Sequence, residues 1–478
     1  MPAAAFSYAD TMSDAADLTA SETLRAFRER SLSPVEVMTA VILRAEQAEP
    51  LLHALWAPDF DRARTEAQAA EARWHRGEPK GPLDGIPVTI KEMIATQGVA
   101  KPIGSAASDM TPQPRDAPPV MRLREAGAIP FAKTTNPDYG MLSSGLSSFH
   151  ALARNPWDTN LTPGGSSAGA GSAAAAGYGP LHLGTDIGGS IRLPAGWCGI
   201  FGLKPSFGRV PIDPPYIGRV AGPMTRTVTD SALMMAALAR PDARDYMSLP
   251  HVEIDWASLD IDLKGLRIGL QMEPGCGLPV DPEVAAAVTA AAQAFETAGA
   301  VVEPVAPYLT REMLDGLDRF WRTRFLDETR HLPPERYARI LPYIRAWVEA
   351  ATDYDGLSVY TGFDQIIRIQ EAGLRAFEGY DFWLSPVAPV PAFPADWASP
   401  VNDPARPFEH IAFTVGANMT QQPAASINCG YTENGLPIGL QIVGRRFDDI
   451  GVLRLAHAYE AMRPAQRPWP TPWTSSRC

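Results

Sequence analysis

Short apolar runs and longer amphipathic stretches alternate along most of this chain. Near the N-terminus, apolar positions recur at helical spacing and predict a helix over residues 18–30, with Thr19 and Glu22 forming a capping box. A second helix is expected to begin at Pro34, since proline suits the first helical position. A third, rich in Ala, Glu and Arg, is predicted over residues 60–76. We expect these helices to pack on the core or on a partner subunit.

Beyond residue 80 the pattern changes to β-prone runs bounded by glycine and proline, most of them followed by a helical stretch. The first of these runs ends at Lys91. Because strand and helix signals alternate, we predict an α/β fold. Strands are predicted over residues 86–90, 128–132, 181–184, 266–270, 300–304, 381–386, 424–429 and 438–443, and helices over residues 120–127, 172–176, 230–238, 282–298 and 451–462.

The later part of the chain contains a helical region and a tail of different composition. Residues 308–374 have a helical pattern rich in aromatic side chains, most of which we expect in the core and some in a substrate pocket. The tail, residues 463–478, is rich in Pro, Trp and Arg and is predicted to be partly disordered. We find no internal repeat. We therefore treat residues 1–478 as one domain, with N-terminal helices over about 18–76 and a core over about 80–230.

Composition and charge exclude several classes of protein. The 478 residues are 45% hydrophobic and 20% charged, as in globular proteins, and the net charge of -12 argues against a nucleic-acid-binding surface. No run of about 18 apolar residues predicts a membrane span, and the first residues lack the pattern of a signal peptide. The four cysteines show no metal-type or redox spacing, and no HExxH pair occurs. We expect a cytoplasmic protein without a metal site.

The stretch from Thr162 to Arg209 contains the candidate chemistry. It holds two glycine–serine clusters, residues 164–167 and 188–190, separated by small residues and a short apolar run. Glycine allows turns in which backbone N–H groups gather round a reacting carbonyl. A serine in such a turn has the surroundings that a nucleophile needs for acyl transfer.

Other interpretations of this stretch fit less well. A flexible linker would not end in core residues such as Trp197 and Phe201. A phosphate-binding loop needs Gly-Lys-Ser/Thr, which follows neither cluster. The nucleophile elbow of α/β-hydrolases, Gly-x-Ser-x-Gly, is absent at Ser190, where the order is Gly-Gly-Ser-Ile-Arg.

A serine nucleophile needs a base, and Lys91 is the available one. Serine reacts slowly until a base takes its proton, and no Ser-His-Asp arrangement is apparent here. A lysine that burial keeps neutral can act as the base, with a second serine passing the proton. From the residues alone, an exposed lysine at a strand end remains an alternative.

Taken together, these motifs resemble those of the amidase signature hydrolases, and the similarity runs from about residue 21 to residue 462. Its specific part is the order Gly-Gly-Ser-Ser, then Gly-Thr-Asp-Ile-Gly-Gly-Ser-Ile-Arg, then Cys-Gly-Ile-Phe-Gly-Leu-Lys-Pro. Gly-Ile-Pro-Val-Thr-Ile-Lys at residues 85–91 matches the lysine strand of that family, and residues 435–441 resemble its C-terminal strand. Ala168, Trp197 and Glu92 are small departures that remove no reacting group.

The resemblance implies the amidase-signature fold, a single α/β/α domain with a mixed central sheet flanked by helices. It also implies Ser190 as the nucleophile, Ser166 as a bridging serine preceded by a cis peptide bond, and Lys91 as the base, with no metal or cofactor. Around these, the backbone N–H groups of Ile187, Gly188, Gly189 and Ser190 would form an oxyanion hole, and Met141, Ser167, Thr185, Asp186 and Arg192 would bind substrate or support the site.

The substrate class is less defined. We expect small neutral amides, anilides or carbamates (urethanes), as for the bacterial aryl-amide- and urethane-cleaving amidases that the chain resembles. Arg209, in a loop bounded by glycine and proline, is either a mobile substrate-contacting residue or a surface residue. Three alternatives stay open: the A subunit of a tRNA-dependent amidotransferase, a carboxylate-directed amidase of the malonamide or carboxybiuret type, and a non-catalytic binding protein on the same fold. A homodimer through the N-terminal helices is a further expectation.

Overall fold

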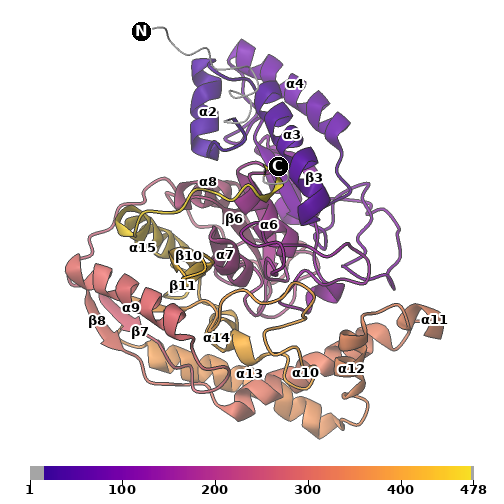
Figure 1. Cartoon of the computed structure of the whole chain (residues 1–478), viewed down its shortest axis with the longest axis vertical. Coiled ribbons are helices and arrows are strands. Elements are labelled where there is room, and N and C mark those ends of the chain that lie inside the picture. Colours follow the sequence, from indigo (N-terminus) through magenta and orange to yellow (C-terminus); the bar gives the residue numbers. More distant parts are fainter. Residues whose placement is uncertain (1–14, 475–478) are drawn as a thin grey trace.

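One mixed sheet runs through the molecule in the computed structural model, which describes residues 15–474 (Figure 1). Its strands are β1 Leu55–Trp56, β2 Pro87–Lys91, β3 Ile129–Thr134, β4 Leu181–Asp186, β5 Phe201–Lys204, β6 Val220–Thr225, β7 Arg267–Leu270, β8 Val301–Pro304, β9 Phe382–Pro386, β10 Ala424–Tyr431 and β11 Pro437–Gly444. Within the described residues these 11 strands lie in the order β1-β3-β2-β4-β6-β5-β10-β11-β9-β7-β8. Strand β2 pairs in parallel with β3 and β4, β7 pairs in parallel with β8 and β9, and the strands between these groups are antiparallel.

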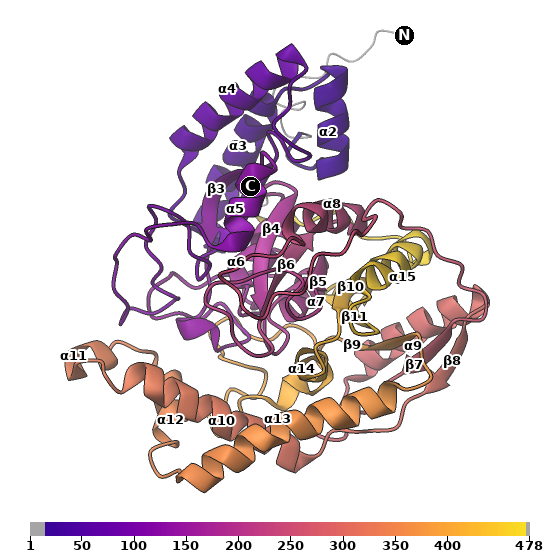
Figure 2. The same ribbon diagram turned by 180° about the vertical axis from the view of Figure 1, so that it is seen from behind.

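Helices cover both faces of the sheet, as the view from behind shows (Figure 2). They are α2 Ala20–Glu29, α3 Pro34–Leu52, α4 Phe60–Arg76, α5 Pro118–Glu125, α6 Ala168–Ala176, α7 Arg192–Cys198, α8 Val228–Leu238, α9 Pro282–Thr297, α10 Arg311–Thr329, α11 Pro334–Tyr337, α12 Pro342–Glu349, α13 Gly356–Phe377, α14 Ala412–Met419 and α15 Asp449–Met462. One face packs on α5, α8, α9 and α15 in the largest core cluster, and α6, α7 and α14 lie on the other. The expected α/β/α architecture is therefore confirmed.

Local sequence signals fixed many of the element boundaries. Helix α2 begins with the predicted capping box of Thr19 and Glu22, α3 has Pro34 at its first position, and α4 covers the predicted residues 60–76. The eight predicted strands all form, each within a few residues of the expected range. The aromatic-rich region folds into α10–α13, which Figure 1 shows as the orange layer at the bottom of the molecule.

One predicted helix starts earlier than expected, and several elements were not predicted. Helix α6 begins at Ala168, four residues before the predicted start at residue 172. Helix α7 and strand β6 were not predicted, because each contains a proline and a glycine, which usually interrupt regular structure. These are Pro194 and Gly196 in α7, and Gly222 and Pro223 in β6. Strand β5 and helix α14 were not predicted either. They have four and eight residues, too few to show a clear periodic pattern.

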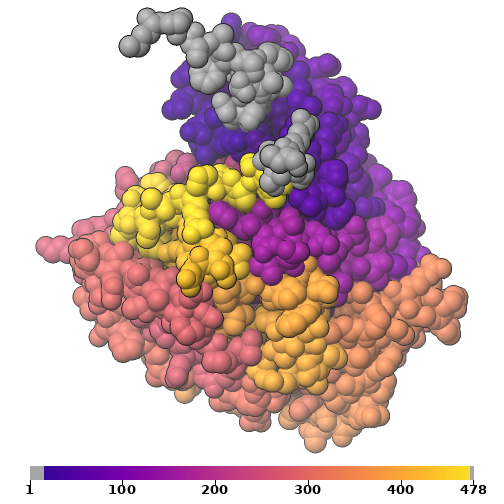
Figure 3. Space-filling model, viewed as in Figure 1, coloured from indigo at the N-terminus to yellow at the C-terminus, as the bar shows by residue number. Residues whose placement is uncertain are grey.

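Residues 463–474 of the tail, which was expected to be partly disordered, pack against the body of the protein. The ring of Trp469 lies 4.4 Å from the guanidinium carbon of Arg226 and 6.3 Å from the ring of Trp157. In Figure 3 the yellow C-terminal residues run across the surface toward the indigo N-terminal helices. The tryptophans that made the composition unusual are what attach this segment to the body of the protein.

Some expectations concern residues that the structure does not describe. The expectation of no signal peptide rests on residues 1–14, which lie outside the described residues. The same holds for residues 475–478 of the tail. Between residues 15 and 474, no helix has the length and apolar character needed to cross a membrane.

Candidate active site

Lys91 lies in the interior of the molecule, at the end of β2. This strand is flanked by β3 and β4, and helices cover both of its faces, so each of its five residues is buried. The Lys91 side chain is 0% exposed. Because helices cover both faces of this strand, its residues do not alternate between buried and exposed positions. The alternative of an exposed lysine at a strand end is therefore excluded.

Three hydroxyl groups surround the Lys91 amine. Lys91 Nζ lies 2.8 Å from Ser166 Oγ, 3.0 Å from Ser167 Oγ and 2.9 Å from Thr185 Oγ1. Among residues 15–474, Lys91 forms no ion pair with a carboxylate. Burial lowers the pKa of Lys91 to about 7, although Asp186 and Glu92 act in the opposite direction. The amine can therefore lose its proton near neutral pH.

Ser166 is positioned by a tightly packed glycine turn. The Gly165–Ser166 peptide bond is cis, as the resemblance implies. A Cβ atom at Gly165 would lie 2.6 Å from the backbone nitrogen of Ser144, so glycine is required there. Ser167 next to it donates from its hydroxyl to the Thr185 carbonyl at 3.1 Å, which ties this turn to β4.

Ser190 lies on the loop between β4 and α7, and its side chain is half-buried. In this loop Gly189 has φ +126°, a value that favours glycine. The Gly189 N–H donates to Asp186 Oδ1 at 2.9 Å, so the expected oxyanion hole needs a correction: this N–H already has a partner. The N–H groups of Ile187, Gly188 and Ser190 have no such hydrogen bond within the described residues.

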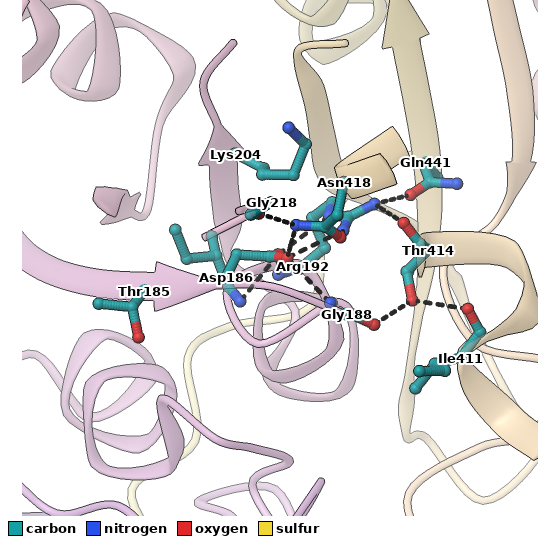
Figure 4. Close-up of polar contacts among 12 residues, drawn as sticks. Thr185, Asp186, Gly188, Arg192, Lys204, Gly218, Ile411, Thr414, Asn418 and Gln441 are labelled. Atoms are coloured by element: carbon teal, nitrogen blue, oxygen red, sulfur yellow. Dashed lines mark hydrogen bonds and ion pairs between the residues drawn. The ribbon is translucent and has the colours of Figure 1, made fainter. Parts of the chain in front are cut away.

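A buried ion pair holds this loop in place (Figure 4). The Arg192 guanidinium donates to Asp186 at 2.9 and 3.0 Å, and both side chains are 0% exposed. Burial would raise the pKa of the Asp186 carboxyl, but Arg192 and other donors hold this pKa well below its usual value. Arg192 also donates to the Thr414 carbonyl, Gln441 and Asn418, and the Thr414 hydroxyl donates to the Gly188 carbonyl at 2.6 Å.

A small apolar pocket adjoins Ser190. Its volume is about 40 Å³, and Met141 lies in its wall, beside the serine as expected. The aromatic-rich helices contribute Trp321 and Phe325 to it, whereas Trp347 belongs to the core and Tyr360 is 65% exposed. The pocket is lined by Met141, Leu142, Ile187, Gly188, Ser190, Leu193, Trp321, Phe325, Phe408 and Ile411, with Gly140, Ser143 and Arg324 at its edges.

A larger cavity of about 460 Å³ lies on the Thr185 side of the site. Its wall includes Met93, Thr185, Tyr139 and three cationic side chains, Lys101, Arg219 and Arg324. None of these three was identified from the sequence, because loops with no periodic pattern carry Lys101 and Arg219, and Arg324 lies within a long helix. The scarcity of lysine, with six in the chain, was the one available signal for Lys101.

Arg209 does not take either of the roles considered for it. Its Nε atom donates to Asp449 Oδ2 at 2.9 Å, and the side chain is buried rather than mobile or on the surface. It lines neither cavity at the site. Since Asp449 also accepts the Ser206 N–H at 2.6 Å, this arginine ties the loop after β5 to the start of α15.

Comparison with known proteins identifies the family. The chain matches the Amidase family model over residues 36–453. The protein belongs to the amidase signature family. It is thus an amidase-type enzyme that acts on C–N bonds. Among residues 15–474, no group of His, Cys, Asp and Glu side chains is arranged to hold a metal ion.

Its relatives include enzymes with different substrates. The A subunit of glutamyl-tRNA(Gln) amidotransferase from Myxococcus xanthus (strain DK1622) is 35% identical over 93% of this chain and 97% of that protein. A bacterial aryl acylamidase of the amidase signature family has a similar structure, with a TM-score of 0.85 and 29% identity over 93% of this chain and 96% of the other. The peptide amidase of Stenotrophomonas maltophilia has a TM-score of 0.81 and 26% identity, covering 94% and 98% of the two chains.

Proposed function

We propose that the protein is a serine hydrolase that cleaves amides, anilides or carbamates through an acyl-enzyme on Ser190. The observation that carries this proposal is the buried Lys91 amine, 2.8 Å from Ser166 Oγ and without an ion-pair partner in the described chain. Burial lowers the pKa of this amine to about 7, so a substantial fraction of it is neutral near pH 7, as a base requires. Ser190 on the glycine loop is the partly accessible serine that can meet a substrate.

The proposed reaction starts with a proton transfer. Neutral Lys91 takes the Ser166 proton while Ser166 takes that of Ser190, and the Ser190 oxygen attacks the substrate carbonyl. The oxyanion is stabilised by the N–H groups of Ile187, Gly188 and Ser190. Ser166 then passes a proton from Lys91 to the leaving nitrogen, because an amine cannot depart as an anion. Water finally hydrolyses the ester on Ser190.

The pocket beside Ser190 supports an apolar acyl group in the substrate. Trp321, Phe325 and Ile411 contribute to its wall, and apolar surfaces of this kind favour aryl or alkyl groups. The structural similarity to an aryl acylamidase is consistent with this preference. The same attack serves the carbonyl of a carbamate, so urethane cleavage remains part of the proposal.

The test is release of nitroaniline from a nitroanilide and from an N-nitrophenyl carbamate, each by cleavage of the C–N bond. We expect turnover by the wild type and none by Ser190→Ala, with labelling of Ser190 by a fluorophosphonate as a separate readout. Arg368→Gln is the control, since Arg368 is exposed on α13 and lies outside both cavities. Equal turnover by the wild type and Ser190→Ala would exclude Ser190 as the nucleophile.

The sequence comparisons favour a second candidate, the A subunit of a tRNA-dependent amidotransferase. The observation behind it is the 35% identity to such a protein over 93% of this chain. This candidate requires partner subunits and uses glutamine as the nitrogen donor. Glutaminase activity that depends on co-purifying subunits would support it, and full activity of the purified single chain on anilides would favour the stand-alone hydrolase.

A further inference from the structure

The wall of the larger cavity beside Thr185 carries three cationic side chains, Lys101, Arg219 and Arg324. Three carboxylates lie in its wall, and each is paired with an arginine. Asp213 pairs with Arg115 at 3.1 Å, Asp327 with Arg330 at 2.8 Å, and Glu328 with Arg324 at 3.0 Å. Within the described residues, Arg219 and Lys101 have no carboxylate partner, and both are partly buried. Glu92 and Asp213 act on Lys101, and Glu328 and Asp245 act on Arg219, without forming an ion pair with it. In the described chain the cavity therefore holds two cations that are not engaged in an ion pair.

These two cations also repel one another. Burial and the nearby Arg219 lower the pKa of Lys101, and burial and Arg324 lower the pKa of Arg219 to about 10. Arg219 donates one hydrogen bond, at 2.6 Å, to the Pro214 carbonyl, which does not neutralise it. An anion bound in the cavity would relieve this repulsion, and a planar guanidinium is well suited to a carboxylate.

The position of the cavity indicates which half of a substrate enters it. A Cβ atom at Gly140 would lie 3.3 Å from Ser166 Oγ and 3.2 Å from the terminal methyl of Met93. Gly140 lines the apolar pocket and Met93 lines the cationic cavity, so the two spaces meet beside Ser166. In the proposed reaction Ser166 gives its proton to the leaving nitrogen. The amine half of a substrate therefore extends from Ser166 into the cationic cavity.

We propose that the preferred substrates are N-acyl amino acids, with an apolar acyl group beside Ser190 and the carboxylate of the amine half bound by Arg219 and Lys101. This inference rests on the proposed function and specifies its substrate class. The Ser190 oxygen bonds to the carbonyl carbon to give the oxyanion, whose collapse breaks the C–N bond. The leaving nitrogen takes a proton through Ser166, and water then cleaves the ester. The products are an apolar carboxylic acid and an amino acid. A volume of about 460 Å³ accommodates a small amino acid.

The test measures binding separately from turnover. Calorimetry with the Ser190→Ala variant would use N-benzoylglycine, N-benzoyl-4-aminobutanoate and N-benzoyl-6-aminohexanoate, each compared with its neutral methyl ester. We expect at least one acid to bind roughly tenfold to a hundredfold more tightly than its ester. N-phenylsuccinamate carries its carboxylate on the acyl half, so it should bind no more tightly than its ester.

Variants in the Ser190→Ala background identify the residues responsible. Arg219→Gln and Lys101→Gln should remove the advantage of the acid and leave ester binding within about twofold, while Arg219→Lys should retain part of it. Arg368→Gln, which removes an exposed arginine on α13 paired with Asp364, is the matched control and should change nothing. Circular dichroism of each variant checks that it is folded. If Arg219→Gln does not fold, the comparison of Arg219→Lys with the parent protein still tests the role of Arg219.

Two results would overturn the inference. One is equal binding of every acid and its ester, and the other is an Arg219-dependent preference for N-phenylsuccinamate instead. If wild type still cleaves a nitroanilide in a Ser190-dependent way, the proposed function survives either result. If the acids bind through Arg219 but the wild type cleaves none of these compounds and no anilide, the binding site is correct and the proposed function is wrong.

Discussion

Arg192 donates to both carboxylate oxygens of Asp186, at 2.9 and 3.0 Å, with no part of either side chain exposed. The same carboxylate accepts the backbone N–H groups of Gly189 and Ile191, at 2.9 and 3.1 Å. Asp186 ends β4 and Arg192 begins α7, so the ion pair closes the loop that carries Ser190. The loop that carries Ser190 and the proposed oxyanion N–H groups is therefore held by a charge pair before any substrate binds.

We expect Asp186→Asn to destabilise the protein by about 3–5 kcal/mol, because it leaves the buried Arg192 charge without its partner. Urea unfolding measures the loss. Since the pKa of Asp186 lies below its unfolded value, its stabilising contribution is complete above about pH 4 and is lost as the pH falls toward the folded pKa. The variant should therefore show a smaller loss of stability than the wild type on acidification below about pH 4.

The control for this prediction is Asp364→Asn, which removes one member of the exposed Arg368–Asp364 pair. Exposed pairs contribute less than about 1 kcal/mol, so this variant should unfold close to the wild-type midpoint. A loss for Asp186→Asn no larger than that of the control would mean that the buried pair does not stabilise the site.

Gly189→Ala should abolish most activity while the protein stays folded. The Gly189 φ of +126° is strained for alanine, and the added Cβ would lie 2.6 Å from Thr414 Oγ1, which itself holds the Gly188 carbonyl. The displaced loop should lower kcat/KM roughly a hundredfold, as loss of an oxyanion donor does. Gly77→Ala is the control, because Gly77 also has a positive φ (73°) but ends α4 with no neighbouring atom within 4 Å. Equal activity losses in the two variants would show that general backbone strain is the cause.

The pH dependence of kcat/KM should follow the Lys91 amine. Because a base acts only when deprotonated, activity should rise with pH through about 7 and level off above it. Nitroanilide hydrolysis between about pH 5.5 and 9 measures this profile. Lys91→Ala should lower kcat/KM roughly a thousandfold or more. Lys91→Arg should not restore activity, since a guanidinium keeps its proton in this range. A flat profile in the wild type would contradict the role of Lys91 as the base.

Much of the fold was predictable because local signals and tertiary structure agree. The Thr19–Glu22 capping box and Pro34 start their helices as expected, and apolar runs bounded by glycine form the strands. Helix α7 could not be predicted in the same way. Its Pro194 and Gly196 are poor helix residues, and only packing inside the protein, where Gly171 of α6 approaches Pro194, makes a helix favourable there.

For the candidate site, motifs identified groups that lie close in the sequence or match the family. The hydroxyl oxygens of Ser166 and Thr185 lie 2.8 and 2.9 Å from the Lys91 amine, as the resemblance suggested. Arg209 and Arg219 show the limit of this approach. Both follow glycine in loops of similar composition, yet one is buried against Asp449 and the other faces the cavity. Which arginine faces the site depends on long-range packing, which the local sequence does not encode.

The C-terminal tail provides the last prediction. Trp469 covers the guanidinium of Arg226, and Arg226 donates to the carbonyls of Ala174 and Ala175, at 2.9 and 3.0 Å, which lie in the last turn of α6. We expect Trp469→Ala to destabilise the protein by about 1–2 kcal/mol, through loss of this cation–π contact and of the contact with Trp157. Activity should be unchanged, because Ser166 lies before the opposite end of α6. Trp397→Ala, at a tryptophan that is 38% exposed, is the control, and urea unfolding with the nitroanilide assay measures both properties. Equal stability of Trp469→Ala and the wild type would mean that the tail rests on the surface without stabilising it.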